Sequence, residues 1–252
     1  SRKSMVNIVV VGIEEGEFND RASLRLSEGQ ESLIQTIAAS GNPTVVVLVG
    51  GSAITMNEWI NDATAILDVW YPGEAGGTAL ANILSGKVNP SGKLPITFPM
   101  YEAQLPLVYN HLPTGRGDDY TNLSGEPLFP FGYGLSYSHV DYSGLNSNNQ
   151  FSKLQLGDTL HVNITLHNTS NMSGDEVVQC YLKSDYSKEI HPVQELIAFK
   201  RISLNAQEQK VLSFDFPLNS ELSAFGLGLG TYEVQIGSSS KDIRMVYRFE
   251  IK

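Results

Sequence analysis

The spacing of apolar residues changes once along this chain, and the change limits the folds that the chain can adopt. In the first half, continuous apolar runs alternate with segments of helical spacing, whereas in the second half apolar and polar residues alternate one by one. Continuous runs are typical of strands buried on both faces of a parallel sheet, and alternation is typical of half-buried antiparallel strands. The sequence therefore predicts an α/β region followed by an all-β region.

The first half predicts a parallel sheet with helices on its faces. Strands are expected at residues 5–13, 44–49 and 65–71, and helices at residues 27–40, 56–60 and 77–84. Ser27 with Gln30 resembles a capping box at the start of the first long helix. Leu33, Ile34, Ile37 and Ala38 share one face of that helix.

A sheet of three parallel strands is smaller than most sheets. Its first strand also starts almost at residue 1 of the chain. These two features predict that the α/β region is incomplete, so that further strands or another chain cover its exposed edge.

The chain loses regular spacing after this region and then becomes a set of short strands. Residues 87–137 are rich in Pro, Gly, Asn and Tyr, which indicates a functional or wrapping segment. One-by-one alternation then recurs, at residues 158–168, 176–183, 210–216 and 231–236. The pattern predicts a fibronectin-III-like or immunoglobulin-like sandwich. We expect two domains, at residues 1–137 and 138–252.

Charge and cysteine content narrow the classes of function. The net charge of −10 argues against nucleic acid as a partner, since binding to its backbone needs clustered Lys and Arg. No apolar run reaches the roughly 18 residues of a membrane span. Cys180 is the only cysteine, so an internal disulfide is ruled out, which suits a cytoplasmic or periplasmic protein. The histidines show no metal-ligand spacing.

The stretch from Glu14 to Arg21 is the most informative part of the sequence. It follows the end of a predicted parallel strand, where open α/β sheets place their ligands. Four carboxylates and one Arg lie within these eight residues, namely Glu14, Glu15, Glu17, Asp20 and Arg21. One interpretation is a solvated acidic loop. The other is a general acid whose pKa is raised by like charge or by burial against Phe18.

Three further side chains are candidates for stacking on a sugar ring, and they are Trp59, Trp70 and His111. Aromatic faces pack against the C–H surfaces of sugars, but large aromatic residues also fill protein cores. Trp70 lies within a strand that is expected to be buried, so core packing is the favoured interpretation for that residue.

Six blocks of the chain, taken in order, resemble glycoside hydrolase family 3. They are GEFNDR with Leu24, Leu26 and Gln30 at residues 16–30, PTVVVLVGG at 43–51, AILDVWYPGEAGG at 65–77, NPSGKLPITFP at 89–99, LFPFGYGLSY at 128–137 and HPVQELIAFKRI at 191–202. Ser27 stands where the family usually has Pro. The blocks cover nearly the whole chain, and PFGYGLSY is the most specific of them.

The resemblance implies a domain order and a set of site residues. Complete members of the family place a TIM-like barrel first, then an α/β sandwich, and often a fibronectin-III-like domain last. The barrel supplies an aspartate nucleophile, and the α/β domain supplies the acid/base, typically the Glu of the GE motif. Carried over, that acid/base is Glu17, and Arg21 supports its loop. Glu14, Glu15 and Asp20 are rival candidates, and no substrate-binding residue is assigned.

The function implied by the resemblance is part of a retaining, exo-acting β-glycosidase, with β-glucosidase ahead of β-xylosidase. Its substrate would be an oligosaccharide with terminal β-linked glucose or xylose, and the chemistry needs neither metal nor organic cofactor. The barrel, in the same gene product or a separate chain, would be the partner, so this chain alone should be inactive. Family resemblance favours a periplasmic or extracellular location over the cytoplasm.

Two other functions remain open on the sequence. The sandwich could be a non-catalytic carbohydrate-binding or adhesion module, although it lacks Trp and has only a few exposed-looking Tyr residues such as Tyr181 and Tyr186. It could instead be a structural brace that packs on the α/β half through the long irregular segment. The brace is the favoured reading for that domain.

Overall fold

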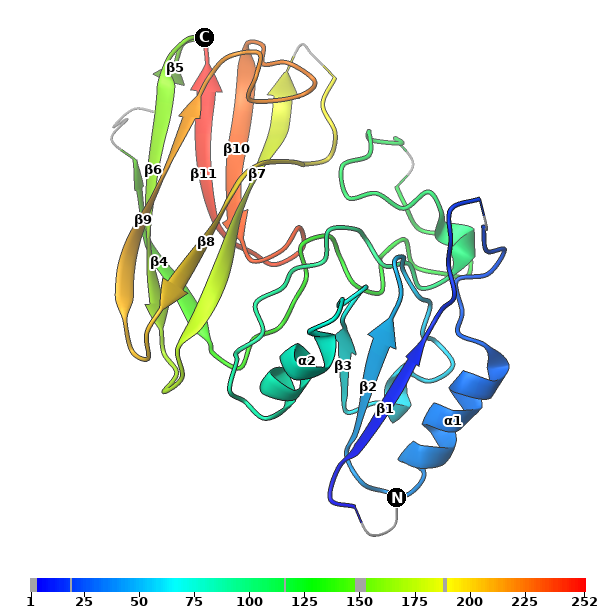
Figure 1. The fold of residues 1–252 in the computed structure, drawn as a ribbon. Helices are drawn as coiled ribbons and strands as arrows, with labels where there is room; N and C mark the ends of the chain where they lie inside the picture. Colours follow the sequence, from blue (N-terminus) through cyan, green and yellow to red (C-terminus); the bar gives the residue numbers. More distant parts are fainter. Residues whose placement is uncertain (1–3, 19, 116, 148–152, 188–189) are drawn as a thin grey trace. The chain divides into compact units, whose positions relative to one another are not determined.

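The computed structural model describes residues 4–18, 20–115, 117–147, 153–187 and 190–252 (Figure 1). Asn19 of the acidic stretch lies outside the described residues. The chain forms two compact units, which we call the α/β unit (residues 1–88, 98–107 and 127–129) and the sandwich unit (residues 89–97, 108–126 and 130–252). Because the chain passes between the units more than once, the boundary expected at residue 138 stays a prediction.

The α/β unit is built on a parallel sheet of three strands in the order β1-β2-β3 (Figure 1). The strands are β1 (Asn7–Gly12), β2 (Thr44–Val49) and β3 (Ala65–Asp68), and both pairings are parallel. The predicted α/β architecture is confirmed. The third strand ends earlier than expected because Trp70 has a positive φ of 49°, which an extended strand does not accommodate.

The first strand is buried on one face only, so the prediction of burial on both faces is wrong. Val9 and Val11 are buried, whereas Ile8 and Val10, which point to the opposite face, are 52% and 58% exposed. Alternate residues of a strand face opposite sides of the sheet. A run of apolar residues therefore shows that both faces suit an apolar contact, but it does not show that each face is covered.

Helix α1 (Glu28–Ala38) starts where the sequence predicts, with Ser27 as its N-cap. The Ser27 side chain accepts a hydrogen bond from the Gln30 amide at 3.4 Å. The Gln30 side chain does not close the capping box, since its Oε1 accepts from the amide of Gly12 at 3.2 Å instead. Leu33 is 46% exposed, so the buried face of the helix centres on Ile34 rather than on the whole predicted set.

The other helical elements are short. Helix α2 (Gly76–Leu84) lies within one residue of its predicted start. A helix at residues 56–60 is wrong, because the backbone there forms a turn that leads into a short 3-10 helix, η1 (Ile60–Asp62). A second one, η2 (Glu102–Gln104), is the only helix that the structure describes between residues 87 and 137. None of the helices in the described ranges is long and apolar enough to cross a membrane.

The sandwich unit consists of antiparallel strands in two sheets, which confirms the predicted all-β region. One sheet has the order β5-β11-β10-β7-β8 and the other β4-β6-β9; within them only β5 and β11 pair in parallel. The strands are β4 (Val140–Ser147), β5 (Lys153–Leu154), β6 (Thr159–Asn168), β7 (Gly174–Ser187), β8 (Glu195–Leu204), β9 (Gln209–Pro217), β10 (Gly230–Gly237) and β11 (Ile243–Ile251). Their inward side chains form one apolar core.

Parts of the long irregular segment pack on the sandwich and belong to its unit. The ring of Tyr109 stacks on Phe131 with centroids 4.2 Å apart, and its hydroxyl accepts the Leu196 amide at 3.2 Å. The Lys93 ammonium donates to the Gly134 carbonyl at 2.8 Å, and burial lowers the pKa of Lys93. Residues that look like loop in the sequence therefore complete the surface of a folded unit.

Candidate active site

The loops that follow the three parallel strands of the α/β unit form an open pocket of about 680 Å³. Its lining consists of Glu15, Gly16, Glu17, Asp20, Arg21, Leu24, Ser52 and Tyr71. The carboxyl ends of parallel strands meet at one edge of a sheet, and ligands of such sheets bind beside that edge. The acidic stretch singled out in the sequence is therefore part of a pocket at the expected edge.

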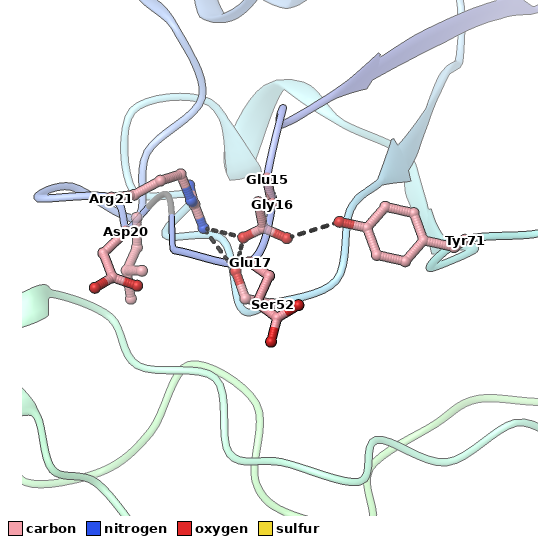
Figure 2. A pocket seen from close by; sticks show the side chains of 8 residues that line it. Glu15, Gly16, Glu17, Asp20, Arg21, Ser52 and Tyr71 are labelled. Atoms are coloured by element: carbon pink, nitrogen blue, oxygen red, sulfur yellow. Dashed lines mark hydrogen bonds and ion pairs between the residues drawn. The ribbon is translucent and has the colours of Figure 1, made fainter.

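The Glu15 carboxylate contacts four other residues at the pocket (Figure 2). Its Oε2 accepts the Gly51 amide at 2.7 Å and the Tyr71 hydroxyl at 3.1 Å. Its Oε1 accepts the Ser52 hydroxyl and pairs with the Arg21 guanidinium at 3.1 Å. Partial burial raises the pKa of Glu15, but the hydrogen bonds and the Arg21 charge outweigh burial, so the pKa lies below its ordinary value.

Glu17 is held quite differently from Glu15. Its side chain is exposed, lines the pocket and, among the described residues, has no hydrogen-bond or ion-pair partner. Figure 2 shows its carboxylate apart from the bonded group around Glu15. A carboxylate without protein partners can exchange a proton with a ligand, whereas one that already accepts several hydrogen bonds is kept ionised.

Arg21 ties the far end of the acidic stretch to the loop after β2. Its Nη2 donates to Ser52 Oγ at 2.7 Å and to the Ala53 carbonyl at 3.4 Å, besides its ion pair with Glu15. Its Nη1 is buried and has no partner among the described residues. All of these contacts join parts of the chain to one another, which suits a residue that supports the loop.

The remaining carboxylates differ in position from the first two. Asp20 is exposed and lines the pocket, while Glu14 is exposed and does not contribute to the lining. Phe18 is 95% exposed, so the expectation that its ring buries a carboxyl group is wrong. Phe18 also has a positive φ of 65°.

The aromatic candidates for sugar stacking do not line the pocket. Trp59 is fully buried and belongs to the core of the α/β unit. Trp70 packs edge-to-face on Phe98, with ring centroids 6.3 Å apart, so core packing is the better interpretation for it. His111 belongs to the sandwich unit, where its Nε2 lies 3.6 Å from Asp118.

Sequence reasoning did not single out three residues that donate hydrogen bonds to Glu15, namely Gly51, Ser52 and Tyr71. Gly51 and Ser52 follow β2, and Tyr71 comes three residues after β3. Their common signal was their place just beyond the carboxyl end of a parallel strand, which is the same signal that marked the acidic stretch. Within the described ranges, no group of three or more His, Cys, Asp or Glu residues is placed to hold a metal ion.

Fold and pocket together define a class of protein: an α/β unit with an acidic pocket at its strand ends, joined to a fibronectin-III-like sandwich. Comparison with family models makes the class specific. Residues 1–137 match the glycosyl hydrolase family 3 C-terminal domain, and residues 176–240 match the fibronectin type III-like domain. The chain belongs to glycosyl hydrolase family 3.

Individual relatives agree with this assignment. The chain is 35% identical to a beta-xylosidase of Formosa agariphila and 34% identical to a periplasmic beta-glucosidase of Salmonella typhimurium, over 96% and 94% of its own length. A crystal structure of beta-glucosidase from Listeria innocua in complex with glucose superposes with a TM-score of 0.89 at 33% identity, over 99% of this chain. The chain spans only 35%, 32% and 37% of these three proteins, about a third of their length.

Proposed function

We propose that this chain supplies the general acid/base of a retaining, exo-acting β-glycosidase, with Glu17 in that role and β-glucosides as the leading substrate class. The observation that carries the proposal is the contrast within one pocket. Glu15 is surrounded by donors and an Arg, while the neighbouring Glu17 is exposed and unpartnered among the described residues. A proton-transfer group has to reach the substrate, so Glu17 suits the role and Glu15 does not.

The chemistry needs a second carboxylate, which acts as the nucleophile. A retaining glycosidase uses two carboxyl groups about 5–5.5 Å apart, of which one attacks the anomeric carbon and the other protonates the leaving oxygen. The group that protonated the leaving oxygen then deprotonates the water that releases the sugar. We assign the nucleophile to a barrel domain, in the same gene product or a separate chain, as the resemblance implies.

The barrel would also supply burial. Burial and neighbouring charge keep a glycosidase acid protonated near neutral pH. Glu17 is exposed in the α/β unit, so the proposal requires a second surface to close over it. The same requirement explains why the 252-residue chain should be inactive by itself.

The sandwich is not favoured as a separate carbohydrate-binding module. Tyr181 is fully buried, and its hydroxyl bonds to Gln179 at 2.5 Å. The exposed rings of Tyr186 and Phe199 do not form one platform. Phe199 lies opposite Gln179 of the neighbouring strand β7. Gln179 is seven residues from Tyr186 on β7, which corresponds to about 23 Å along the strand. These two rings therefore do not support a sugar-binding role for the sandwich.

The test compares the chain alone with its assembly with a barrel-bearing polypeptide. Alone, it should release no nitrophenol from nitrophenyl β-glucoside, and the assembly should release it. Glu17→Gln should lower kcat of the assembly by about 10²- to 10⁴-fold. Azide should restore turnover of that variant on the nitrophenyl substrate, because it attacks the glycosyl-enzyme without needing a base.

Glu14→Gln is the matched control, because it removes an exposed carboxylate of the same loop outside the pocket lining. Its kcat should stay within about threefold of wild type. Turnover by the isolated chain, or full activity of Glu17→Gln in the assembly, would overturn the proposal.

A further inference from the structure

The Glu15 carboxylate connects the loops that follow all three strands of the parallel sheet. Glu15 itself follows β1, the Gly51 amide and the Ser52 hydroxyl follow β2, and the Tyr71 hydroxyl follows β3. Its side chain is only 17% exposed, although it lies in a pocket open to solvent. One side chain thus joins three loops that are otherwise separate in the sequence.

The loop after β3 is shaped to bring Tyr71 to this carboxylate. Trp70 has a left-handed backbone, which is costly for a bulky residue. The Asp68 side chain accepts the Trp70 amide at 3.1 Å, and the Trp70 carbonyl accepts the Gly50 amide at 3.3 Å. Backbone strain of this kind persists where surrounding contacts impose it, and here it turns Tyr71 toward Glu15.

Gly51 leaves room for the Tyr71 ring. A Cβ at Gly51 would lie 2.6 Å from Tyr71 Cε2, closer than carbon atoms approach. The absence of a side chain there lets the ring lie over the backbone and lets the Gly51 amide point at Glu15. The contact between these two loops therefore depends on a glycine at this position.

Arg21, at the other end of the acidic stretch, contacts the same group of residues around Glu15. Arg21 pairs with Glu15 at 3.1 Å and donates to Ser52 at 2.7 Å. The Glu15–Arg21 pair closes the base of a short loop, and Glu17 lies on that loop. Glu15 and Arg21, at the two ends of this loop, therefore both contact residues that follow another strand of the sheet.

We propose that Glu15 is a positioning residue, which acts through Arg21, Tyr71 and the Gly51 amide to hold the loop that presents Glu17. This inference rests on the proposed function of Glu17. The carboxylate suits the role because it accepts from every side, whereas an amide in its place would turn an NH₂ group toward donors. Misplacement of a reacting group by about 1 Å costs up to about 100-fold in rate.

The first test needs only the chain itself and does not depend on catalysis. Backbone ¹⁵N relaxation should give order parameters near about 0.85 for Gly16, Glu17 and Phe18 in the wild type, and below about 0.6 in Glu15→Gln. Glu14→Gln is the control and should match the wild type. The unfolding midpoint of all three proteins should agree within about 2 °C.

The second test uses the barrel-containing assembly and two leaving groups. Glu15→Gln should lower kcat/KM, which reports the glycosylation step, about 10- to 100-fold on a disaccharide and much less on dinitrophenyl β-glucoside, whose departure needs little acid assistance. KM for the disaccharide should stay within about twofold. Added to Glu17→Gln, the same change should lower kcat less than threefold further, since it acts through Glu17.

The outcomes distinguish a failure of the positioning role of Glu15 from a failure of the proposed function of Glu17. Unchanged loop order in Glu15→Gln, or a loss of order that spreads over the whole sheet with a lower melting point, overturns the positioning role. An equal loss of kcat/KM on both leaving groups also overturns it, because that result points to a general structural defect. If Glu17→Gln itself shows neither loss nor azide rescue, the proposed function fails instead.

Discussion

The two units differ in how far the apolar faces of their sheets are buried. In the sandwich unit, the inward residues Leu160, Val162, Ile164 and Leu166 of β6 are all fully buried, because a second sheet covers them. In the α/β unit, β1 is equally apolar, yet Ile8 and Val10 are more than half exposed. The same residue types are core in one unit and surface in the other.

The difference shows that the sandwich unit covers its own inward apolar residues, whereas the face of β1 with Ile8 and Val10 is exposed in the α/β unit. Two packed sheets bury each other's inner faces, whereas an open three-stranded sheet leaves an apolar strand face and an edge to be covered by something else. The loops of the candidate site belong to the α/β unit. The proposed two-carboxylate mechanism, divided between domains, requires a further surface over these loops.

The largest effect is expected in the core of the sandwich. Ile164→Ala removes three carbon atoms from a fully buried position, and the free energy of unfolding should fall by about 2–5 kcal/mol. Urea unfolding followed by far-ultraviolet circular dichroism would measure it. Val211→Ala, at a position 68% exposed, is the control and should stay within about 0.5 kcal/mol. Equal losses for the two variants would contradict the self-contained core.

Two glycines offer a sharper comparison between the units. Gly132 has a φ of 80°, and a Cβ there would lie 2.0 Å from Oε1 of Gln179, which is itself buried. Gly132→Ala should therefore cost about 2–4 kcal/mol from strain and overpacking. At Gly51 the obstructing group is the exposed Tyr71 ring, which can swing away. Gly51→Ala should cost less than about 1 kcal/mol but release Tyr71 from Glu15.

Both glycine variants can be read out by urea unfolding, with circular dichroism for the sandwich and tryptophan fluorescence for the α/β unit. The two tryptophans, Trp59 and Trp70, both lie in the α/β unit, so fluorescence reports that unit alone. A Gly51→Ala variant as unstable as Gly132→Ala would show that the site face is as tightly packed as the sandwich.

The next prediction tests the two faces of β1. Val9 is 3% exposed and Val10 is 58% exposed, although they are neighbours of the same type. Val9→Ala should lower the free energy of unfolding by about 2 kcal/mol, and Val10→Ala by less than about 0.5 kcal/mol in the isolated chain. Tryptophan fluorescence in urea would measure both. A loss at Val10 as large as that at Val9 would mean that the outer face of β1 is covered after all.

The smallest effect concerns Asp68, whose side chain accepts the Trp70 amide. Burial raises the pKa of Asp68, although the Trp70 hydrogen bond opposes the rise. The folded state therefore holds this proton more tightly than the unfolded chain, so the group's contribution to stability is greatest at low pH and is lost as pH rises through the folded pKa.

Asp68→Asn keeps the acceptor and removes the charge, so it should be as stable as wild type, or more stable by less than about 1 kcal/mol, at pH 8. The advantage should shrink as the pH is lowered to 4. Urea unfolding followed by tryptophan fluorescence at the two pH values measures the difference. A variant that is less stable at pH 8 than at pH 4, relative to wild type, would show that the charge stabilises the turn.

Much of the fold followed from local pattern. The bounds of β2 agreed with the continuous apolar run, Ser27 capped α1 as its position predicts, and alternation marked the strands of the sandwich. Each of these features depends on residues a few positions apart, so the sequence contains the whole signal. The exposed face of β1 was not predictable in this way, because burial depends on what lies over a strand.

The candidate site was likewise predictable from the sequence only in part. The sequence by itself determined that an acidic stretch with Arg21 follows a parallel strand, and the family resemblance pointed to Glu17 within it. It did not distinguish the environments of Glu15 and Glu17, which are the same residue type two positions apart. Only the tertiary structure decided that, by bringing Gly51 and Tyr71 to Glu15 from 36 and 56 residues away. Hydrogen bonds between distant loops, and not local pattern, make one carboxylate an anchor and leave the other exposed.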